Sequence, residues 1–460
     1  MNLSAIRPRF VTLFTLYITM AGGSYALYHL VLPVRVFHHL FMTLFLVWWF
    51  LRRGLPASPF TFPLLIMTGW VSISVAFAID QRMAIEFAWH WVVNIALVFV
   101  LIDWARQGQL PAVYRGLFWG AAFLASTMVY QGLTAPQYRA AGAFVIVNLA
   151  GAYLAALFMP MWFGKLYARN WTLVIWLLAL TSALLFNQSR GAWLAVIISG
   201  AICAGLRWPG FRAWMLPVGV LGIAVIVSSL HSTGRLAGDE LRLHLWSAAG
   251  ELIQQRPLTG VGPGLFAQGY YQLDTALYDA RMTGPHNYYL SVASELGLPA
   301  LLIGAWLLWS LWRTLPHSLT NQQLAALGGL GGILAHMLVD NYPVTAYAFV
   351  VAVFAVTVWG EVRPPVLKPQ QLYHGNVGYL VFFATVGWWF LLVDFAQWRF
   401  EQSWRGYGLP AAQQAARLDP LVDLYQLNVA RLAGEDVQAT VGAEVNLEEW
   451  AMTNYGRLWR

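Results

Sequence analysis

The chain has 460 residues, of which 59% are hydrophobic and 10% are charged, and its formal net charge is +7. A soluble protein carries about 25% charged residues, so this composition excludes an ordinary soluble fold and indicates a polytopic α-helical membrane protein. The basic residues are scattered singly between apolar segments, which does not indicate nucleic-acid binding. A single cysteine, Cys203, excludes a framework of disulfides within the chain.

Thirteen apolar runs are candidates for crossing a bilayer, which takes about 17–25 residues. They cover 10–31, 36–51, 62–79, 86–103, 115–133, 140–162, 171–187, 191–206, 212–230, 286–312, 322–340, 344–360 and 376–396. No small-residue cleavage site follows the first run, so we interpret it as an uncleaved span. The expected fold is an all-α bundle of about 12–13 transmembrane helices.

Lysine and arginine in the short connections predict the orientation of these spans. With the N-terminus in the cytoplasm, the inner connections hold most basic residues, and the outer ones hold only Arg35, Arg82, Arg139 and Arg190. Such an excess of basic residues marks the cytoplasmic side. The sequence therefore predicts a multi-pass protein of the plasma (inner) membrane, and an odd number of spans places the C-terminus outside.

Residues 231–285 form the one long outer loop of this topology. Apolar side chains repeat at three- and four-residue spacing over 239–256, which predicts a helix. The run Gly260–Gly264 is expected to end that helix in a tight turn and to offer backbone amides to a ligand.

Residues 397–460 are charged and amphipathic, so we expect an external helical tail beyond a transmembrane domain of residues 1–396. The run from Ala411 to Pro420, with Tyr425 and Asn428 beyond it, resembles a tetratricopeptide unit. One such unit cannot bury its apolar face alone, so the tail is a candidate surface for a protein partner. A plain amphipathic tail is the alternative.

The first polar feature on the outer face is the connection Asn187–Trp193. It places Arg190 at the lipid–water boundary, where the free-energy cost of a charged side chain in the membrane is partly relieved. Gly191 permits close approach of a backbone or ligand. The alternative is an arginine that merely extends to the interface.

The second feature lies in the expected loop helix, where Arg242 precedes Trp246 by four residues and shares a helix face with it. A guanidinium group binds phosphate oxygens in a fork. A surface salt bridge from Arg242 to Asp239 is the alternative.

The third feature is His286-Asn287, which opens the run 286–312 after Gly284-Pro285. A titratable group at the boundary between water and lipid is a candidate site residue. Asn287 is expected to orient the imidazole or to cap the helix, and Gly297 is expected to lie on that same helix. The alternative is that His286 only caps the span.

No group of residues has metal-ligand spacing, and no Asp-x-Asp, P-loop or nucleotide-binding glycine pattern is present. We therefore predict neither a metal nor a cofactor.

Together these residues resemble the O-antigen ligase family, which also includes related polymerases and protein O-oligosaccharyltransferases. The resemblance rests on Ser189–Trp193, on Arg242–Trp246 with Pro257–Gly264, and on His286-Asn287-x9-Gly297. It covers roughly residues 1–365. The last motif departs from the family pattern at its final position, which is Ala300 here.

The resemblance implies a glycosyltransferase with a GT-C-like bundle. It would transfer a glycan from undecaprenyl pyrophosphate to an acceptor hydroxyl at the external, periplasmic face, with inversion and without metal. His286 would be the general base, with Arg190 and Arg242 as catalytic cations. The implied diphosphate and glycan ligands are Arg190, Arg242, Arg281, Arg139, Asn287 and Trp246. Its partners would be the lipid-linked donor, a lipid, polysaccharide or protein acceptor, and membrane lipids.

Other functions remain open from the sequence. The shared donor chemistry leaves an O-antigen or exopolysaccharide polymerase and a protein O-oligosaccharyltransferase as alternatives to a ligase. A polysaccharide transporter is less favoured, because the ionisable residues gather at one face and the chain shows no internal repeat. A membrane scaffold is less favoured, because it would leave Arg190, Arg242 and His286 without a role.

Overall fold

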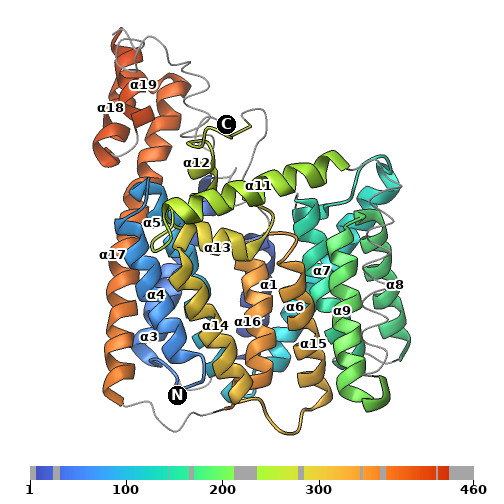
Figure 1. Ribbon diagram of the computed structural model, residues 1–460. Coiled ribbons are helices and arrows are strands. Elements are labelled where there is room, and N and C mark those ends of the chain that lie inside the picture. The colour runs from blue at the N-terminus through green and yellow to red at the C-terminus, as the bar shows by residue number, and fades with distance from the viewer. Residues whose placement is uncertain are drawn as a thin grey trace.

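The computed structural model describes residues 7–23, 32–144, 146–164, 170–211, 236–277, 284–341, 345–362, 369–420 and 423–434 (Figure 1). All regular structure within these ranges is helical, which confirms the expected all-α class. The candidate span 212–230 lies outside the described residues.

Most of the described helices stand side by side as one bundle (Figure 1). They are α1 (Pro8–Gly23), α3 (Leu32–Arg52), α4 (Thr61–Ala76), α5 (Gln81–Arg106), α6 (Leu110–Thr134), α7 (Val147–Gly164), α8 (Asn170–Asn187), α9 (Arg190–Arg207), α14 (Leu298–Arg313), α15 (Asn321–His336), α16 (Thr345–Trp359) and α17 (Pro369–Gln402). Within the described residues, α3, α5, α6, α9 and α17 are long and apolar enough to cross a membrane, and several others are shorter apolar helices. The chain is a multi-pass membrane protein.

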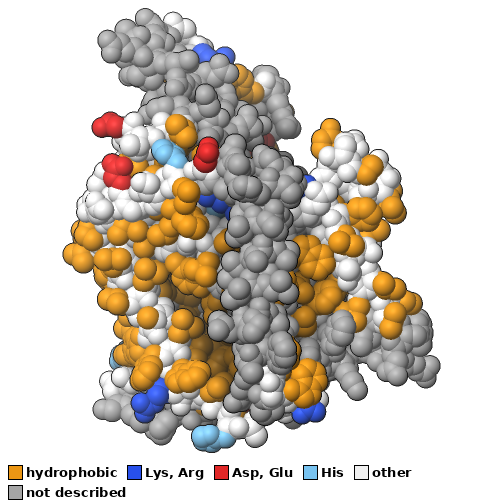
Figure 2. All heavy atoms as spheres, turned by 45° about the vertical axis from the view of Figure 1, so that its right-hand side comes forward, with side chains coloured by type: hydrophobic (Ala, Val, Ile, Leu, Met, Phe, Trp, Pro, Cys, Tyr) orange, Lys and Arg blue, Asp and Glu red, His pale blue; other side chains and the backbone are white. Residues whose placement is uncertain are grey.

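Two ends of the bundle differ in their charged residues. The helices α3, α5, α9 and α14 all run toward the same end, and their last turns hold Arg52, Arg106, Arg207 and Arg313. In Figure 2, hydrophobic side chains gather at mid-height on both sides of the view, and the acidic side chains that it shows lie near the upper end. This distribution is what a bilayer around the middle of the bundle requires.

A layer of helices that lie across the bundle covers the upper end in Figure 1. It consists of α11 (Leu236–Gln255), α12 (Phe266–Tyr270) and α13 (Tyr288–Leu296). The helix expected over 239–256 is therefore confirmed as α11. Its apolar face buries Leu245, Ala248 and Leu252 in a cluster with Ala84 of α5, which holds the layer on the bundle.

The expected single helix over 286–312 is wrong, because it consists of α13 and α14, separated at Gly297. Gly297 has a φ of 77°, which is costly for any residue with a Cβ atom. A Cβ atom there would lie 1.9 Å from the backbone oxygen of Leu258. Hydropathy could not show this break, because both helices are apolar and no polar residue separates them.

The bundle helix α17 runs unbroken past residue 396, where we expected the tail to start. A π-helical turn (Ser403–Tyr407), α18 (Gly408–Leu418) and α19 (Asp423–Ala433) follow. The tetratricopeptide character of this tail stays a prediction, and residues 435–460 lie outside the described residues.

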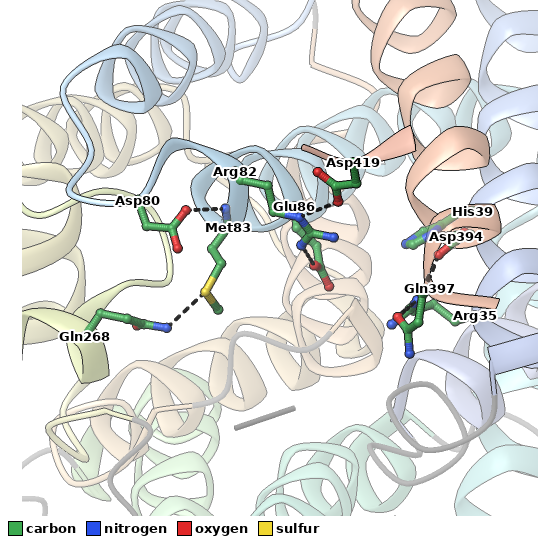
Figure 3. A network of polar contacts seen from close by, with 10 residues as sticks. All are labelled: Arg35, His39, Asp80, Arg82, Met83, Glu86, Gln268, Asp394, Gln397 and Asp419. Carbon is green, nitrogen blue, oxygen red and sulfur yellow. Dashed lines mark hydrogen bonds and ion pairs between the residues drawn. The ribbon is translucent and has the colours of Figure 1, made fainter. Parts of the chain in front are cut away.

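Figure 3 shows two polar contacts near this end of the chain, of which the first attaches the tail to the bundle and the second joins two bundle helices. Arg82, near the start of α5, donates from Nε to Oδ2 of Asp419 at 3.1 Å. Asp419 is the residue immediately after α18. Arg35 of α3 donates from Nε to Asp394 Oδ1 of α17 at 3.0 Å. The two carboxylates are 2–3% exposed and the two arginine side chains are 11–12% exposed, so these pairs are largely shielded from solvent.

Candidate active site

The connection between α8 and α9 places Arg190 at the upper end of the bundle. Gln188 has a φ of 55°, which turns the chain sharply. The Ser189 hydroxyl then accepts from the backbone N–H of Ala192 at 3.3 Å and caps α9. Arg190 is therefore the first residue of α9, and its position is fixed by the cap behind it.

Gly191 lines the pocket described below, and it also allows close packing of two helices. A Cβ atom there would lie 2.7 Å from Nε2 of His336, at the end of α15. α9 and α15 therefore approach closely at the site, and His336 is buried between them.

Helix α11 brings Arg242 to the same end of the molecule. Trp246, one turn further along α11, donates from Nε1 to the backbone oxygen of Pro285 at 2.9 Å. This contact fixes α11 against the residue that precedes His286. The side chain of Asp239 lies outside the described residues, so its salt bridge to Arg242 remains untested.

His286 lies two residues before the start of α13, with a φ of 50° that is uncommon for a residue other than glycine. Its Nδ1 lies 2.9 Å from Oδ1 of Asp340, and its side chain is 39% exposed. Asn287, not His286, caps α13, because its Oδ1 accepts from the N–H of Leu290 at 3.1 Å. The Asn287 amide also donates to the backbone oxygen of Leu338 at 3.0 Å.

Asp340 is a site residue that the sequence analysis did not assign. Its carboxyl group at the end of the apolar run 322–340 is the signal that could have identified it. It follows α15 and is 4% exposed. Its Oδ2 accepts from Nδ2 of Asn148 at 2.9 Å, and its Oδ1 also accepts from the N–H of Asn341 at 3.0 Å. These donors stabilise a charged carboxylate beside His286.

A pocket of about 80 Å³ joins these elements. It is lined by Arg139, Asn148, Gln188, Ser189, Arg190, Gly191, Arg242, Val339 and Asp340. Three guanidinium groups against one carboxylate give the lining an excess of positive charge, which favours an anionic ligand. The structure thus brings together Arg139, Arg190 and Arg242, and Asp340 connects them to His286.

The glycine-rich turn does not offer its amides to a ligand, contrary to expectation. The N–H groups of Val261 and Gly262 donate to the backbone oxygens of Ser294 and Glu295 at 2.9 Å each. That of Gly264 donates to Oε2 of Glu295 at 2.9 Å. The turn therefore holds the C-terminal end of α13.

Glu295 is a buried carboxyl group within this contact. Burial raises its pKa to about 7, and backbone hydrogen bonds from Gly264 and Phe266 partly oppose that rise. The carboxyl group therefore titrates near neutrality at the joint between the glycine-rich turn and α13.

Arg281 and Arg139 are the two remaining predicted ligands. Arg281 lies outside the described residues. Arg139 lines the pocket and donates from Nε to the backbone oxygen of Asn187 at 3.0 Å. Among the described residues, no group of three or more His, Cys, Asp or Glu side chains is arranged to hold a metal ion.

Comparison with known proteins identifies the central part of the chain. Residues 173–305 match the family described as O-antigen ligase. Residues 173–305 are an O-antigen ligase family domain. This domain contains Arg190, Arg242 and His286, and it also spans the helix from Asn287 to Gly297. No curated protein matches the chain.

The O-antigen ligase domain does not contain the whole pocket. Arg139 and Asn148 precede it, and Asp340 follows it. Membership implies, at the level of the family, a glycosyltransferase activity that uses lipid-linked glycans. The residues outside the matched segment complete the surroundings of residues inside it.

Proposed function

We propose that the protein transfers a glycan from undecaprenyl pyrophosphate to an acceptor hydroxyl at the external face of the plasma membrane, with inversion and without a metal ion. One observation carries this proposal. Arg190 and Arg242 line one pocket with Asp340, and Asp340 Oδ1 lies 2.9 Å from Nδ1 of His286. Cations for a leaving group and a base for an acceptor thus lie together.

The arginines suit the departure of a pyrophosphate. Negative charge develops on the phosphate oxygen as its bond to the anomeric carbon breaks, and fixed cations stabilise that charge most in a water-poor site. A pocket of about 80 Å³ is small against the roughly 300–1,000 Å³ of typical ligand sites, so it suits a phosphate group rather than a whole glycan. In this proposal Arg139 is a further phosphate ligand.

His286 is the proposed general base. Its Nδ1 faces Asp340, which holds the tautomer whose Nε2 is an acceptor. The acceptor hydroxyl gives its proton to Nε2, and its oxygen bonds to the anomeric carbon. The bond from that carbon to the pyrophosphate oxygen breaks, and undecaprenyl pyrophosphate leaves with the electron pair. Attack opposite the leaving group inverts the anomeric configuration.

The proposed orientation places the pocket outside the cell. Arg52, Arg106, Arg207 and Arg313 lie at the other end of the bundle, and basic residues favour the cytoplasmic side. The N-terminus is then cytoplasmic, and the layer of α11, α12 and α13 is external.

Within the family, we favour a ligase over a polymerase or a protein O-oligosaccharyltransferase, because the motifs of residues 189–193 and 286–297 are of the ligase type. The products distinguish these activities. A ligase gives a single transfer to a different acceptor, whereas a polymerase gives a ladder of lengths on the undecaprenyl carrier.

The rate of glycan transfer by the His286→Ala variant tests whether His286 is the general base. We expect the rate to fall by about 10²–10⁴, the usual contribution of a general base. The matched control is His317→Ala, because His317 is an exposed histidine next to the opposite end of the bundle. Membrane insertion and protein level should stay unchanged in both. Full transfer by His286→Ala contradicts the proposal.

A matched pair on α9 tests the phosphate role. Arg190→Lys keeps the charge and loses the fork, so transfer should fall by about 10²-fold or more. Arg207→Lys, at the other end of the same helix, should transfer normally.

Assays with purified protein, undecaprenyl-pyrophosphate glycan and a chelator test metal independence, and dependence on a divalent cation would contradict the two-arginine mechanism.

A further inference from the structure

A line of three polar contacts lies behind His286. Arg139 donates from Nη2 to Oδ1 of Asn148 at 2.8 Å. Asn148 donates from Nδ2 to Oδ2 of Asp340 at 2.9 Å, and Asp340 Oδ1 lies 2.9 Å from His286 Nδ1. The contacts join α7 to segments about 140 and 190 residues further along the chain, so only the folded bundle assembles them.

The neighbours of Asn148 fix the direction of its amide. A guanidinium group is only a donor and an ionised carboxylate is only an acceptor. The amide oxygen therefore faces Arg139, and the amide nitrogen faces Asp340. A flipped amide would place two donors against each other on one side and two acceptors on the other.

We propose that Asn148 is a positioning residue for glycan transfer, which it supports by holding Asp340 and thereby the tautomer and direction of His286. The inference rests on the proposed function of His286 as the base. The Asn148 hydrogen bond holds Oδ2 of Asp340, and the N–H of Asn341 holds Oδ1, so the two bonds together oppose rotation of the carboxylate away from the imidazole. Misplacement of a reacting group by about 1 Å costs roughly 10²-fold in rate, so this support is large enough to measure.

Arg139 extends the same support to the other side of the pocket. Its Nε donates to the backbone oxygen of Asn187, whose own amide nitrogen donates to the backbone oxygens of Ala140 and Val147 at 2.7 Å each. Asn187 lies at the end of α8, directly before the turn that carries Arg190. Arg139 therefore holds both the base side and the cation side. Asn148 accepts one hydrogen bond from Arg139, but the bond from Arg139 to Asn187 does not depend on it, so loss of Asn148 affects mainly the base side.

This difference gives the inference a kinetic signature. In Asn148→Ala we expect kcat to fall by about 10–100-fold, with KM for the lipid-linked donor within about twofold of the unchanged protein, because Arg190 and Arg242 keep their positions and Arg139 keeps its bond to Asn187. In Arg139→Ala kcat should fall and KM for the donor should rise. The matched control is Asn376→Ala, since the Asn376 amide donates to Phe50 near the opposite end of the bundle, and it should leave both constants unchanged.

Asn148→Asp adds a readout that a merely structural residue would not change. The variant keeps the shape and the contact to Arg139, but it places a second carboxyl group against Asp340. The added negative charge favours a protonated imidazole, so the acidic limb of the kcat–pH profile should move to higher pH. An unchanged profile, or kcat at the level of the control in Asn148→Ala, overturns the inference.

The experiment also separates this inference from the proposed function. If His286→Ala abolishes transfer and both Asn148 variants retain the normal kcat and pH profile, only the role of Asn148 is wrong. If His286→Ala transfers normally, the base assignment fails, and the inference fails with it. Should Asn148→Ala not fold, the isosteric Asn148→Asp decides through its pH profile.

Discussion

Asn287 and Gly297 are the two caps of one helix. The Asn287 side chain accepts from the N–H of Leu290 and begins α13, and Gly297 ends it with a φ of 77°. The nine residues between the two motif positions are therefore the whole of α13. The spacing of the motif is a helix length, which sets the direction of His286 at one end and of α14 at the other.

Gly297→Ala should destabilise the protein by about 1–3 kcal/mol from backbone strain alone. Its Cβ atom would also meet the Leu258 oxygen at 1.9 Å. We expect a lower midpoint of thermal unfolding in detergent, followed by intrinsic tryptophan fluorescence. Gly304→Ala in α14 is the control, because no atom outside its own helix backbone lies within 4 Å of its added Cβ and alanine favours a helix. Equal midpoints for the two variants would contradict the capping role of Gly297.

Asp340→Asn should lower kcat by about 10²–10⁴-fold without unfolding the protein. The new amide nitrogen must face either Asn148, which is also a donor, or His286 Nδ1. In the second case the imidazole carries its hydrogen on Nε2, so Nε2 cannot take the proton from the hydroxyl group of the acceptor substrate. Steady-state transfer rates test this, with Asp103→Asn near the opposite end of the bundle as the control. Normal turnover by Asp340→Asn would show that the carboxylate is not needed.

Glu295 should make stability depend on pH. Its pKa is raised from 4.5 to about 7 in the folded protein, so folding favours the protonated form. The resulting stabilisation is fully present below about pH 4.5 and is lost as pH rises through about 7, with a size on the order of 3 kcal/mol. Glu295→Gln remains neutral and keeps an acceptor for Gly264.

The measurement compares unfolding midpoints of the unchanged protein and Glu295→Gln from pH 5 to 8. We expect the midpoint of the unchanged protein to fall over this range relative to that of the variant. Parallel profiles for the two proteins would show that Glu295 is not the group responsible.

Arg82→Ala should release the tail from the bundle. It leaves the buried carboxylate of Asp419 without its cation, and breaking a buried pair in this way costs about 3–5 kcal/mol. Amide hydrogen exchange in α18 and α19 should therefore become faster, while exchange in α5 changes less. Arg417→Ala is the control, since Arg417 is exposed on α18. Unchanged exchange in Arg82→Ala would show that the apolar contacts alone dock the tail.

The site was partly predictable from the sequence. Arg190 and His286 are predictable because each is an ionisable residue beside an apolar run, where it is costly without a role. Arg242 is predictable from the helical spacing that places it on one face with Trp246. Asp340 was not assigned, because its value comes from a partner 54 residues away in the chain. The glycine-rich turn was misjudged, since only the fold shows that α13 already accepts its amide hydrogens.

The sequence by itself determined the helical class, the apolar spans and the helix α11, because hydropathy and helical periodicity are local properties of the chain. Only the tertiary structure decided that 286–312 is two helices and that Asn148 and Asp340 stand behind His286. Hydrogen-bond partners and close approaches at glycines depend on which segments meet, and that is set by packing of the whole bundle rather than by any one segment.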